Sequence, residues 1–360
     1  MKVIINKDIL VNALNTIDKV VVSKASLPIL TGYFIEATKE VIIFKGTNGD
    51  ESIIFEVEVD GLQVTVEEPG KIVVPSNFLS IAKKLDEDIE MSIQDLLMHI
   101  KSGKSIFKLN CMDGAEYPAI KYQTDNPLLS MTVDEFKDIV RKTAYAASTT
   151  EMRPILQSVH VKLNGKASFS ATDSHRLAYV KKDGEFSEDI SANIPAKALI
   201  VLSRIINDGD IEIFIAHNQI TFKNDKTTFI TRVLEGNYPE TDRLIPNSYL
   251  TTIKVNTESL IKSLELLKVI DVKADLEIKQ DVLKLSNQQE TGAVKDEVVV
   301  DQFNGEELVL ACNVDYLLDA LKNIDSEDCI LNFQGDSKPF TLVSPNHDNE
   351  LHLLLPIRRY

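Results

Sequence analysis

The chain carries a threefold internal repeat, and this repeat restricts its fold more than any other feature of the sequence. Three amphipathic segments with apolar residues at helical spacing begin the copies, at residues 7–19, 133–147 and 257–270. The equivalent positions Leu10, Phe136 and Leu260 lie 126 and 124 positions apart. A period this long predicts three linked globular units, because thin solenoids are built from repeats of about 20 to 50 residues.

A second helical segment recurs in each copy, at residues 74–85, 194–206 and 311–324. Its equivalent positions Leu79, Leu199 and Tyr316 are 120 and 117 apart, so both helices keep nearly one period. Pro75 and Pro195 are expected to open the first two of these helices, where a missing N–H costs nothing. Short segments rich in Ile, Val, Phe and Thr lie between and after the helices and predict β-strands.

These patterns predict an α+β fold of three tandem similar domains, each with two helices packed on antiparallel sheets. Two polar, proline-bearing stretches, residues 121–130 and 244–252, are the candidate linkers. The expected domains are therefore residues 1–124, 125–250 and 251–360.

Composition favours a soluble protein of the cytoplasm. Apolar residues make up 44% of the 360 positions, and no apolar run reaches the roughly 18 residues that a membrane span needs. The N-terminus lacks the apolar run of a signal peptide, so we expect a cytoplasmic location and no membrane partner. The three cysteines (Cys111, Cys312 and Cys329) form no C-x-x-C pair, which argues against a zinc site or a disulfide framework.

The formal net charge of −16 argues against a protein that grips nucleic acid tightly, yet the six repeat helices carry much of the basic charge. Two interpretations stay open. These side chains form ordinary solvated helix faces, or all six helices face one axis and contact phosphates without reading bases. An encircled duplex would tolerate an acidic exterior, because its retention is topological. The candidate DNA-facing residues are Lys24, Lys83, Lys84, Lys137, Arg141, Lys142, Lys197, Arg204, Lys262 and Lys322.

The residue types of a hydrolase triad occur together at Asp173, Ser174 and His175, which makes a Ser/His hydrolase the alternative from another class. Because neighbours in a strand point to opposite faces, we expect no nucleophile–base pair there and no enzymatic activity. The six histidines lack metal-site spacing, and SGKS at 102–105 lacks the rest of a phosphate-binding loop and is expected to be a turn. No catalytic residue, metal or cofactor is therefore expected.

Six motifs, in a fixed order, carry a resemblance to a known family. They are SLPILTG (26–32), EYP (116–118), RPIL (153–156), ATDSHRLA (171–178), EGNYPETDRLIP (235–246) and LLLPIRRY (353–360). Together they resemble the beta subunit of bacterial DNA polymerase III, the sliding clamp family, over essentially the whole chain. The resemblance implies the DNA clamp fold and a head-to-tail homodimer that closes into a ring around duplex DNA.

The resemblance also implies a processivity factor that tethers DNA polymerase and other replication and repair proteins, and that a clamp loader places on DNA. Such partners dock short peptide motifs in a pocket between the second and third domains. Apolar pocket residues can accept aliphatic or aromatic anchors, and polar ones can hydrogen-bond the peptide. Transferred by motif, the pocket residues are Leu156, Thr172, Ser174, His175, Arg176, Leu177, Pro246, Leu355, Pro356, Ile357 and Arg358, flanked by Asn313 and Tyr316.

By the same resemblance, the subunit interface joins sheet edges of the first and third domains. Its candidate residues are Phe107, Leu109, Val269 and Ile270. The chain departs from the family at residues 271–280, where a longer segment is typical, and at Lys24, where relatives often have arginine. A diverged clamp paralogue with an accessory repair role is therefore the alternative within the family.

Overall fold

The computed structural model describes residues 1–216, 218–290 and 292–358, with the backbone alone at 185–188. Residues 359–360, which end the terminal motif, lie outside this part. The chain divides into two compact units. Unit 1 contains Met1–Phe136 and Val201–Val233, and unit 2 contains Lys137–Ile200 and Leu234–Tyr360.

Within the described residues, six α-helices lie in the segments that the repeat predicts. Asparagine caps three of them, because Asn6, Asn256 and Asn313 each accept a hydrogen bond from a backbone N–H of the first turn. The helices are α1 (Lys7–Ile17), α2 (Asn77–Ala82), α3 (Val133–Ala144), α4 (Ala196–Ile205), α5 (Thr257–Lys268) and α6 (Val314–Leu321).

The prediction that prolines open α2 and α4 is wrong. Pro75 is the last residue of β6 (Gly70–Pro75), and Pro195 is the last residue of β13 (Arg176–Pro195). Each stays in strand register, opposite Gly32 and Ser158 respectively. The proline ring fixes φ near −65°, a value that extended backbone also adopts, so it fits the end of a strand.

Unit 1 contains two antiparallel sheets in its described residues, ordered β5-β1-β7-β8-β9 and β10-β6-β2-β3-β4-β16-β15-β14-β11. The first comprises β1 (Lys2–Ile5), β5 (Val64–Glu68), β7 (Ile89–Gln94), β8 (Leu97–Ser102) and β9 (Ser105–Asn110). Besides β6, the second comprises β2 (Gly32–Ala37), β3 (Val41–Thr47), β4 (Glu51–Glu58), β10 (Met112–Asp113), β11 (Leu129–Thr132), β14 (Asp210–Ala216), β15 (Gln219–Lys223) and β16 (Thr227–Arg232).

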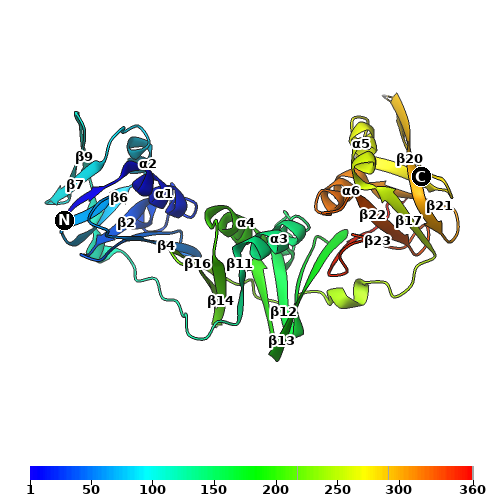
Figure 1. The fold of residues 1–360 in the computed structure, drawn as a ribbon, viewed down its shortest axis with the longest axis horizontal. Coiled ribbons are helices and arrows are strands. Elements are labelled where there is room, and N and C mark those ends of the chain that lie inside the picture. Colours follow the sequence, from blue (N-terminus) through cyan, green and yellow to red (C-terminus); the bar gives the residue numbers. More distant parts are fainter. Residues whose placement is uncertain (217, 291, 359–360) are drawn as a thin grey trace. The chain divides into compact units, whose positions relative to one another are not determined.

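The larger sheet of unit 1 crosses from the first repeat into the second. β4 and β16 pair antiparallel, with Phe55 opposite Thr227. Helix α1 packs on β3 and β4 and contacts α2, beside the strands of the first repeat (Figure 1). Leu10, Leu14 and Phe44 are fully buried, so the core of this repeat lies between helix and sheet.

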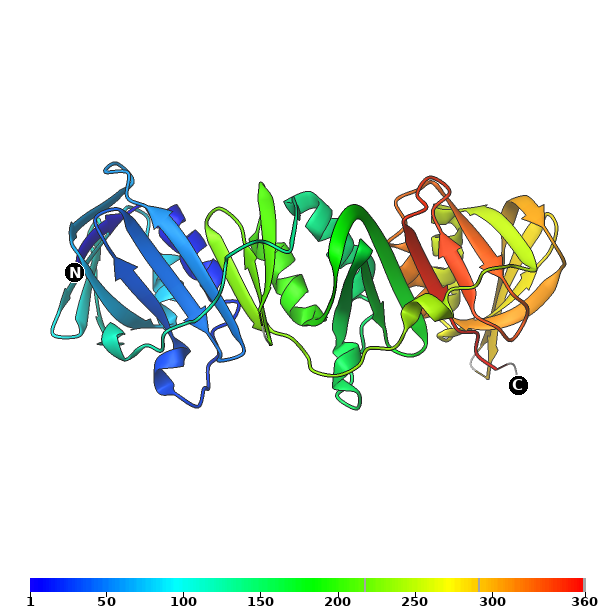
Figure 2. The ribbon, with the colours of Figure 1, turned by 90° about the horizontal axis from the view of Figure 1, so that it is seen from below.

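Unit 2 contains one long antiparallel sheet, ordered β12-β13-β24-β23-β22-β17-β20-β19-β18-β21. Strands β22 to β24, coloured towards the red end, lie side by side in Figure 2. Besides β13, its strands are β12 (Ser158–Thr172), β17 (Thr251–Asn256), β18 (Lys273–Ile278), β19 (Val282–Gln289), β20 (Gly292–Asn304), β21 (Leu308–Asn313), β22 (Asp328–Phe333), β23 (Phe340–Val343) and β24 (Glu350–Leu354).

Unit 2 also joins two repeats through one sheet, because β13 of the second repeat pairs with β24 of the third. Helices α5 and α6 pack on each other, and their buried residues share a core with Cys312 and Cys329, both free thiols. Residues 271–280 supply β18, which pairs with β19 and β21. None of the described helices is long and apolar enough to cross a membrane.

Candidate functional site

The pocket that the sequence predicts centres on the turn between β12 and β13. Asp173 Oδ1 accepts hydrogen bonds from the backbone N–H groups of His175 (2.8 Å) and Arg176 (3.1 Å). Thr172 Oγ1 accepts one from the N–H of Ser174 (3.1 Å). Ser174 has a φ of 81°, in the left-handed region that is strained for a residue with a side chain. The side chains on either side of Ser174 therefore hold a strained turn in place.

Arg176 reaches from this turn into a cluster of charged and aromatic groups. Its Nε donates to Asp173 Oδ2 (2.9 Å), and its Nη1 donates to Asp319 Oδ2 (2.6 Å). Its Nη2 donates to the carbonyl oxygen of Tyr145 (2.8 Å), and its guanidinium lies 4.6 Å from the ring centre of Tyr316. The side chain is only 11% exposed. Three of its nitrogens thus already donate within the protein, which makes Arg176 a wall of the pocket more than a group open to a peptide.

The C-terminal segment lies beside the turn. Leu177 of β13 stands opposite Leu353 of β24. The N–H of Leu355 donates to the carbonyl oxygen of His175 (2.9 Å). The N–H of Ile357 donates to the carbonyl oxygen of Ala311 in β21 (2.8 Å). The side chains of Leu355 and Ile357 stay 38% and 36% exposed. Two motifs far apart in sequence therefore form one surface that offers apolar side chains to solvent.

An apolar cluster continues from this turn along the sheet. Leu177, Tyr179 and Leu353 are buried against one another, with Ile245 and Leu351 partly buried on them. Pro246 follows Ile245 in the chain and is half-buried. Such a cluster is the kind of floor on which aliphatic or aromatic anchors of an extended peptide pack.

The two flanking residues lie at the start of α6 and play different parts: Asn313 ends β21, and Tyr316 is in the helix. Asn313 Oδ1 accepts hydrogen bonds from the N–H groups of Asp315 (2.9 Å) and Tyr316 (3.3 Å), so Asn313 caps the helix. The ring of Tyr316 stacks near that of His175, with centroids 6.3 Å apart and planes 20° from parallel. Tyr316 therefore reaches the turn, whereas the contacts of Asn313 serve its own helix.

For the remaining predicted pocket residues, the structure gives their position in the chain and their burial. Leu156 is buried in the short 3-10 helix Pro154–Gln157 that precedes β12. Pro356 is half-buried and Arg358 is exposed, on either side of Ile357.

The arrangement of Asp173, Ser174 and His175 does not support the hydrolase alternative. The three residues lie in a turn between β12 and β13, so the argument from alternating strand neighbours was wrong, although no triad forms. The Asp173 carboxylate accepts from backbone N–H groups and from Arg176, while Ser174 Oγ accepts from Arg153 Nη1 (3.4 Å). A triad instead needs the base hydrogen-bonded to both the serine and the carboxylate.

The predicted DNA-facing residues fall into two classes. Within the described residues, six have no carboxylate within ion-pair distance: Lys24, Lys83, Lys84, Lys137, Lys197 and Arg204. The others are paired. Lys262 lies 2.6 Å from Glu258 and Lys322 lies 3.1 Å from Glu265. Arg141 contacts Asp138 at 2.5 Å and also Asp325.

Lys142 has to be removed from the DNA-facing set. Its side chain is 8% exposed, and its Nζ lies 2.5 Å from Glu350 and 3.0 Å from Asp138. Burial lowers the pKa of Lys142, but hydrogen bonds and charge from Glu350 and Asp138 outweigh burial and raise that pKa above its ordinary value. Because the ammonium is buried and neutralised inside the protein, it cannot contact a phosphate.

Exposed apolar residues mark the two predicted interface segments. β9 is an edge strand that pairs only with β8 among the described strands, and Phe107 on it is 38% exposed. Ile106, which sequence reasoning did not single out, is 69% exposed on the same strand. Val269, just after α5, is 79% exposed, and Ile270 is half-buried. Leu109 is half-buried near the end of β9.

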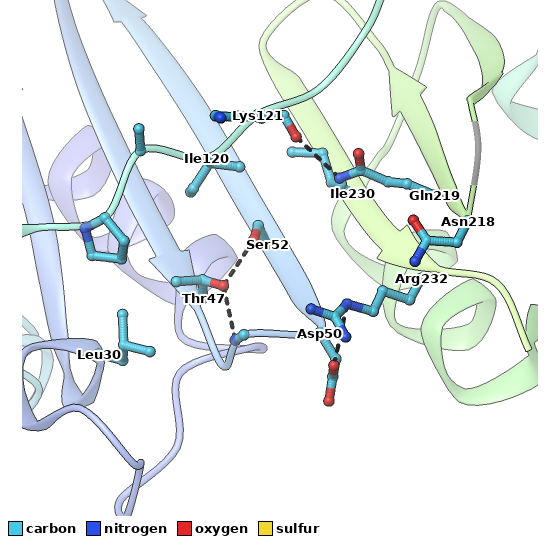
Figure 3. A pocket seen from close by; sticks show the side chains of 13 residues that line it. Leu30, Thr47, Asp50, Ser52, Ile120, Lys121, Asn218, Gln219, Ile230 and Arg232 are labelled. Carbon is cyan, nitrogen blue, oxygen red and sulfur yellow. Dashed lines mark hydrogen bonds and ion pairs between the residues drawn. The ribbon is translucent and has the colours of Figure 1, made fainter.

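A polar hollow of about 300 Å³ lies within unit 1, where the first repeat meets the second (Figure 3). Side chains from the β3–β4 hairpin, the segment after Pro118 and β15–β16 point toward one another there. Arg232 Nε lies 3.5 Å from Asp50, and Gln219 Nε2 donates to the Lys121 carbonyl (3.2 Å). These groups pair with one another across the boundary between the two repeats, so we assign the hollow no binding role.

Comparison with known proteins follows the same three-part division. Models of the N-terminal, central and C-terminal domains of the DNA polymerase III beta subunit match residues 1–121, 130–240 and 242–358. The beta sliding clamp of Bacillus subtilis is 37% identical, with 100% of both chains covered. The chain belongs to the beta sliding clamp family. Its function is that of a clamp, and its three tandem domains have the clamp fold.

Solved clamp structures agree with the described fold. The Bacillus subtilis DNA polymerase sliding clamp matches with a TM-score of 0.95 at 35% identity and covers 100% of each chain. The beta subunit from Streptococcus pyogenes matches with a TM-score of 0.95 at 31% identity, again over 100% of each chain. The curated clamp of Streptococcus pneumoniae is 36% identical, with 98% of each chain covered.

Sequence reasoning missed the residues that hold Arg176 and Lys142 in place. Asp319 and Tyr145 hold Arg176, and Glu350 holds Lys142. Their partners lie in other repeats or elements, and no spacing in the sequence links them. The only signal was the position of Asp319 on the predicted sixth helix, three residues after Tyr316.

Proposed function

We propose that this chain forms a homodimeric ring that encircles duplex DNA and holds DNA polymerase and other replication or repair proteins on it. The observation that carries the proposal is the joining of the 172–177 turn to the C-terminal segment. The bond between the N–H of Leu355 and the carbonyl of His175 brings the two most family-specific motifs together. A clamp tethers its partners through such a surface and needs no chemistry of its own.

The docking surface would take an extended peptide with aliphatic or aromatic anchors. Leu355, Ile357 and the floor around Leu177 would offer apolar contacts, and the exposed His175 would offer a polar group. Thr172 is buried and its hydroxyl bonds within the turn, so it would shape the pocket without contacting a peptide. DNA polymerase, the clamp loader and other proteins with a clamp-binding motif would share it. Sharing one site means that these partners compete for each subunit.

Ring closure would pair the β9 edge of one protomer with the third domain of its partner. The exposed Ile106, Phe107 and Val269 are apolar, and their burial would stabilise the dimer. The edge strand β9 would gain a partner and lose its unpaired backbone groups. We keep residues 1–124, 125–250 and 251–360 as the proposed domains.

The DNA-facing surface would consist of the unpaired cations Lys24, Lys83, Lys84, Lys137, Lys197 and Arg204, with Arg141, Lys262 and Lys322 as weaker members. Such contacts are exchangeable and carry no base readout, which suits sliding. The clamp would catalyse no reaction, and ATP hydrolysis for loading would belong to the loader. A protein that acts on bacterial DNA in this way would work in the cytoplasm.

The test has two parts. Light scattering coupled to size exclusion should give twice the mass of the chain at micromolar concentration. After loading by the clamp loader of the same organism, the protein should stay on nicked circular DNA and leave when a restriction enzyme linearises that DNA. A monomer, or equal retention on linear DNA, would refute the ring.

A further inference from the structure

Arg176 links two elements that belong to different repeats. It begins β13 in the second repeat, and its Nη1 donates to Asp319 of α6, 143 positions away in the third. The guanidinium is 11% exposed, whereas the Asp319 carboxylate is 47% exposed. A charge-assisted bond whose cation is largely buried is worth more than an ordinary surface pair, because water competes less for the cation.

Asp319 shares its helix face with a pocket residue. Tyr316 and Asp319 are three positions apart on α6, a spacing that places both on one side of the helix. Arg176 contacts both: its Nη1 binds the carboxylate at 2.6 Å, and its guanidinium lies 4.6 Å from the ring centre of Tyr316. The bond to Asp319 therefore fixes the guanidinium against the ring.

The same ring also meets the turn. The Tyr316 and His175 rings stack at 6.3 Å, and the carbonyl of His175 accepts the bond from Leu355 that places the C-terminal segment. Tyr316 thus lies between the α6 side of the pocket and the turn that carries its polar groups. A change in the position of this ring alters the shape of the docking surface itself.

We propose that Asp319 is a positioning residue of the docking pocket, which acts through Arg176 to hold Tyr316 against the 172–177 turn. The inference rests on the proposed docking function and adds a residue to it. Asp319 itself does not touch the peptide. It preorganises the wall that the peptide meets, so that less ordering has to occur on binding.

The chain offers a matched control in an ion pair between α5 and the end of α6. The Glu265–Lys322 pair also ties α6 to a neighbouring element, at 3.1 Å, with both side chains 53% exposed. Glu265→Gln removes one carboxylate charge from the α5–α6 surface, as Asp319→Asn removes one from the pocket side. Asp319→Asn takes the carboxylate partner from Arg176, whereas Glu265→Gln takes it from Lys322.

The probe is the tightest peptide selected from a library of randomised six-residue peptides against the wild-type protein. Affinity and dissociation rate are measured by surface plasmon resonance for wild type, Asp319→Asn, Asp319→Glu and Glu265→Gln. We expect about a tenfold loss of affinity for Asp319→Asn, mostly as faster dissociation, because a charge-assisted bond at the wall is lost. Asp319→Glu should recover most of the loss, and Glu265→Gln should stay within about twofold of wild type.

A double-mutant cycle separates positioning from a general effect on folding. In a Tyr316→Ala background the ring is absent, so Asp319→Asn should cost little further affinity. Thermal unfolding of each variant checks that the fold is kept. Full additivity of the two losses, or an unchanged affinity for Asp319→Asn, overturns the inference while leaving the docking function standing. A wild-type protein that selects no peptide overturns both.

Discussion

Lys142 at the end of α3 and the Lys83–Lys84 pair just after α2 look alike in the sequence but differ in the folded chain. All three are basic residues of predicted repeat helices. Lys83 and Lys84 are exposed and, within the described residues, have no carboxylate at ion-pair distance. Lys142 is buried against Glu350, whose side chain is fully buried. The same residue type on a predicted repeat helix is thus exposed in one place and buried in an ion pair in another.

The source of the difference is the pairing of β13 with β24. Glu350 begins β24 and stands opposite Val180 of β13, and in that position its carboxylate meets the ammonium of Lys142. His352, two residues further on β24, is fully buried and its Nδ1 lies 2.8 Å from the hydroxyl oxygen of Tyr145. Lys142 of α3 and Tyr145 just after it are thus paired with buried groups of β24.

The largest effect should come from Lys142→Met. This change leaves Glu350 as an unpaired buried carboxylate, and loss of one partner of a buried pair costs about 3 to 5 kcal/mol of unfolding free energy. Urea denaturation at fixed protein concentration measures the cost. A double variant that also carries Glu350→Gln should recover part of the stability, because the stranded charge is gone.

The control for this prediction is the neighbouring residue. Arg141 is 39% exposed and binds Asp138 and Asp325, so Arg141→Met should cost only about 0 to 1 kcal/mol. Equal losses for Arg141→Met and Lys142→Met would remove the contrast between buried and exposed cations.

A smaller effect should follow from His352 and should depend on pH. Burial, with the charges of Lys142 and Arg141 adding to it, lowers the pKa of His352 to about 3. Below a pH of about 6.5 the unfolded chain binds a proton at this imidazole and the folded chain does not, so folding stability falls as the pH falls. His352→Asn should abolish this component, which amounts to about 2 kcal/mol between pH 7 and pH 5.

Urea unfolding of wild type and His352→Asn at pH 7, 6 and 5 checks this expectation. The gap between the two proteins should narrow as the pH falls, because only the wild type carries the titrating imidazole. His347→Asn, at an exposed histidine in the loop before β24, is the matched variant. Parallel curves for wild type and His352→Asn would show that the imidazole is not held neutral.

The smallest effect concerns DNA binding by the exposed lysines, Lys83 and Lys84. Lys83→Ala with Lys84→Ala should lower the salt dependence of duplex binding, with the slope of log K against log salt changing by about 1 to 2. Fluorescence anisotropy with a labelled duplex, across a range of salt concentrations, measures the slope. Folding stability should stay close to that of wild type, because both side chains are exposed.

Lys262→Ala with Lys322→Ala is the matched pair of changes. Their ammonium groups already lie near Glu258 and Glu265, so removing them should change the salt slope less than the Lys83 and Lys84 changes. A larger effect of the Lys262 and Lys322 changes would mean that ion pairing within the protein does not decide phosphate contact.

The helices and the family could be predicted from the sequence, because both depend on local sequence patterns. Apolar residues at helical spacing, such as Leu260 and Leu264, mark a buried helix face wherever the helix lies. The proximity of the 171–178 and 353–360 motifs was also predictable, because the family resemblance implies it, and β13 does pair with β24.

The charged network behind the pocket was not within reach. Whether Arg176 meets a peptide or meets Asp319 depends on the place of α6 relative to the turn, a tertiary property that no local spacing encodes. The fate of Lys142 depends likewise on a strand that begins about two hundred residues later. Long-range ion pairs have no periodicity, so single-sequence reasoning cannot assign them.

The strand pairs β4–β16 and β13–β24 set a limit on how such a chain can evolve. In most repeat proteins a copy can be lost or gained at a linker with little harm. Here neighbouring copies are joined by hydrogen bonds between their strands. Deleting a copy would therefore leave strands with unpaired backbone groups, which promote aggregation. The number of copies in this chain is therefore fixed by its sheets, and changes in its length should be confined to turns such as the one after α5.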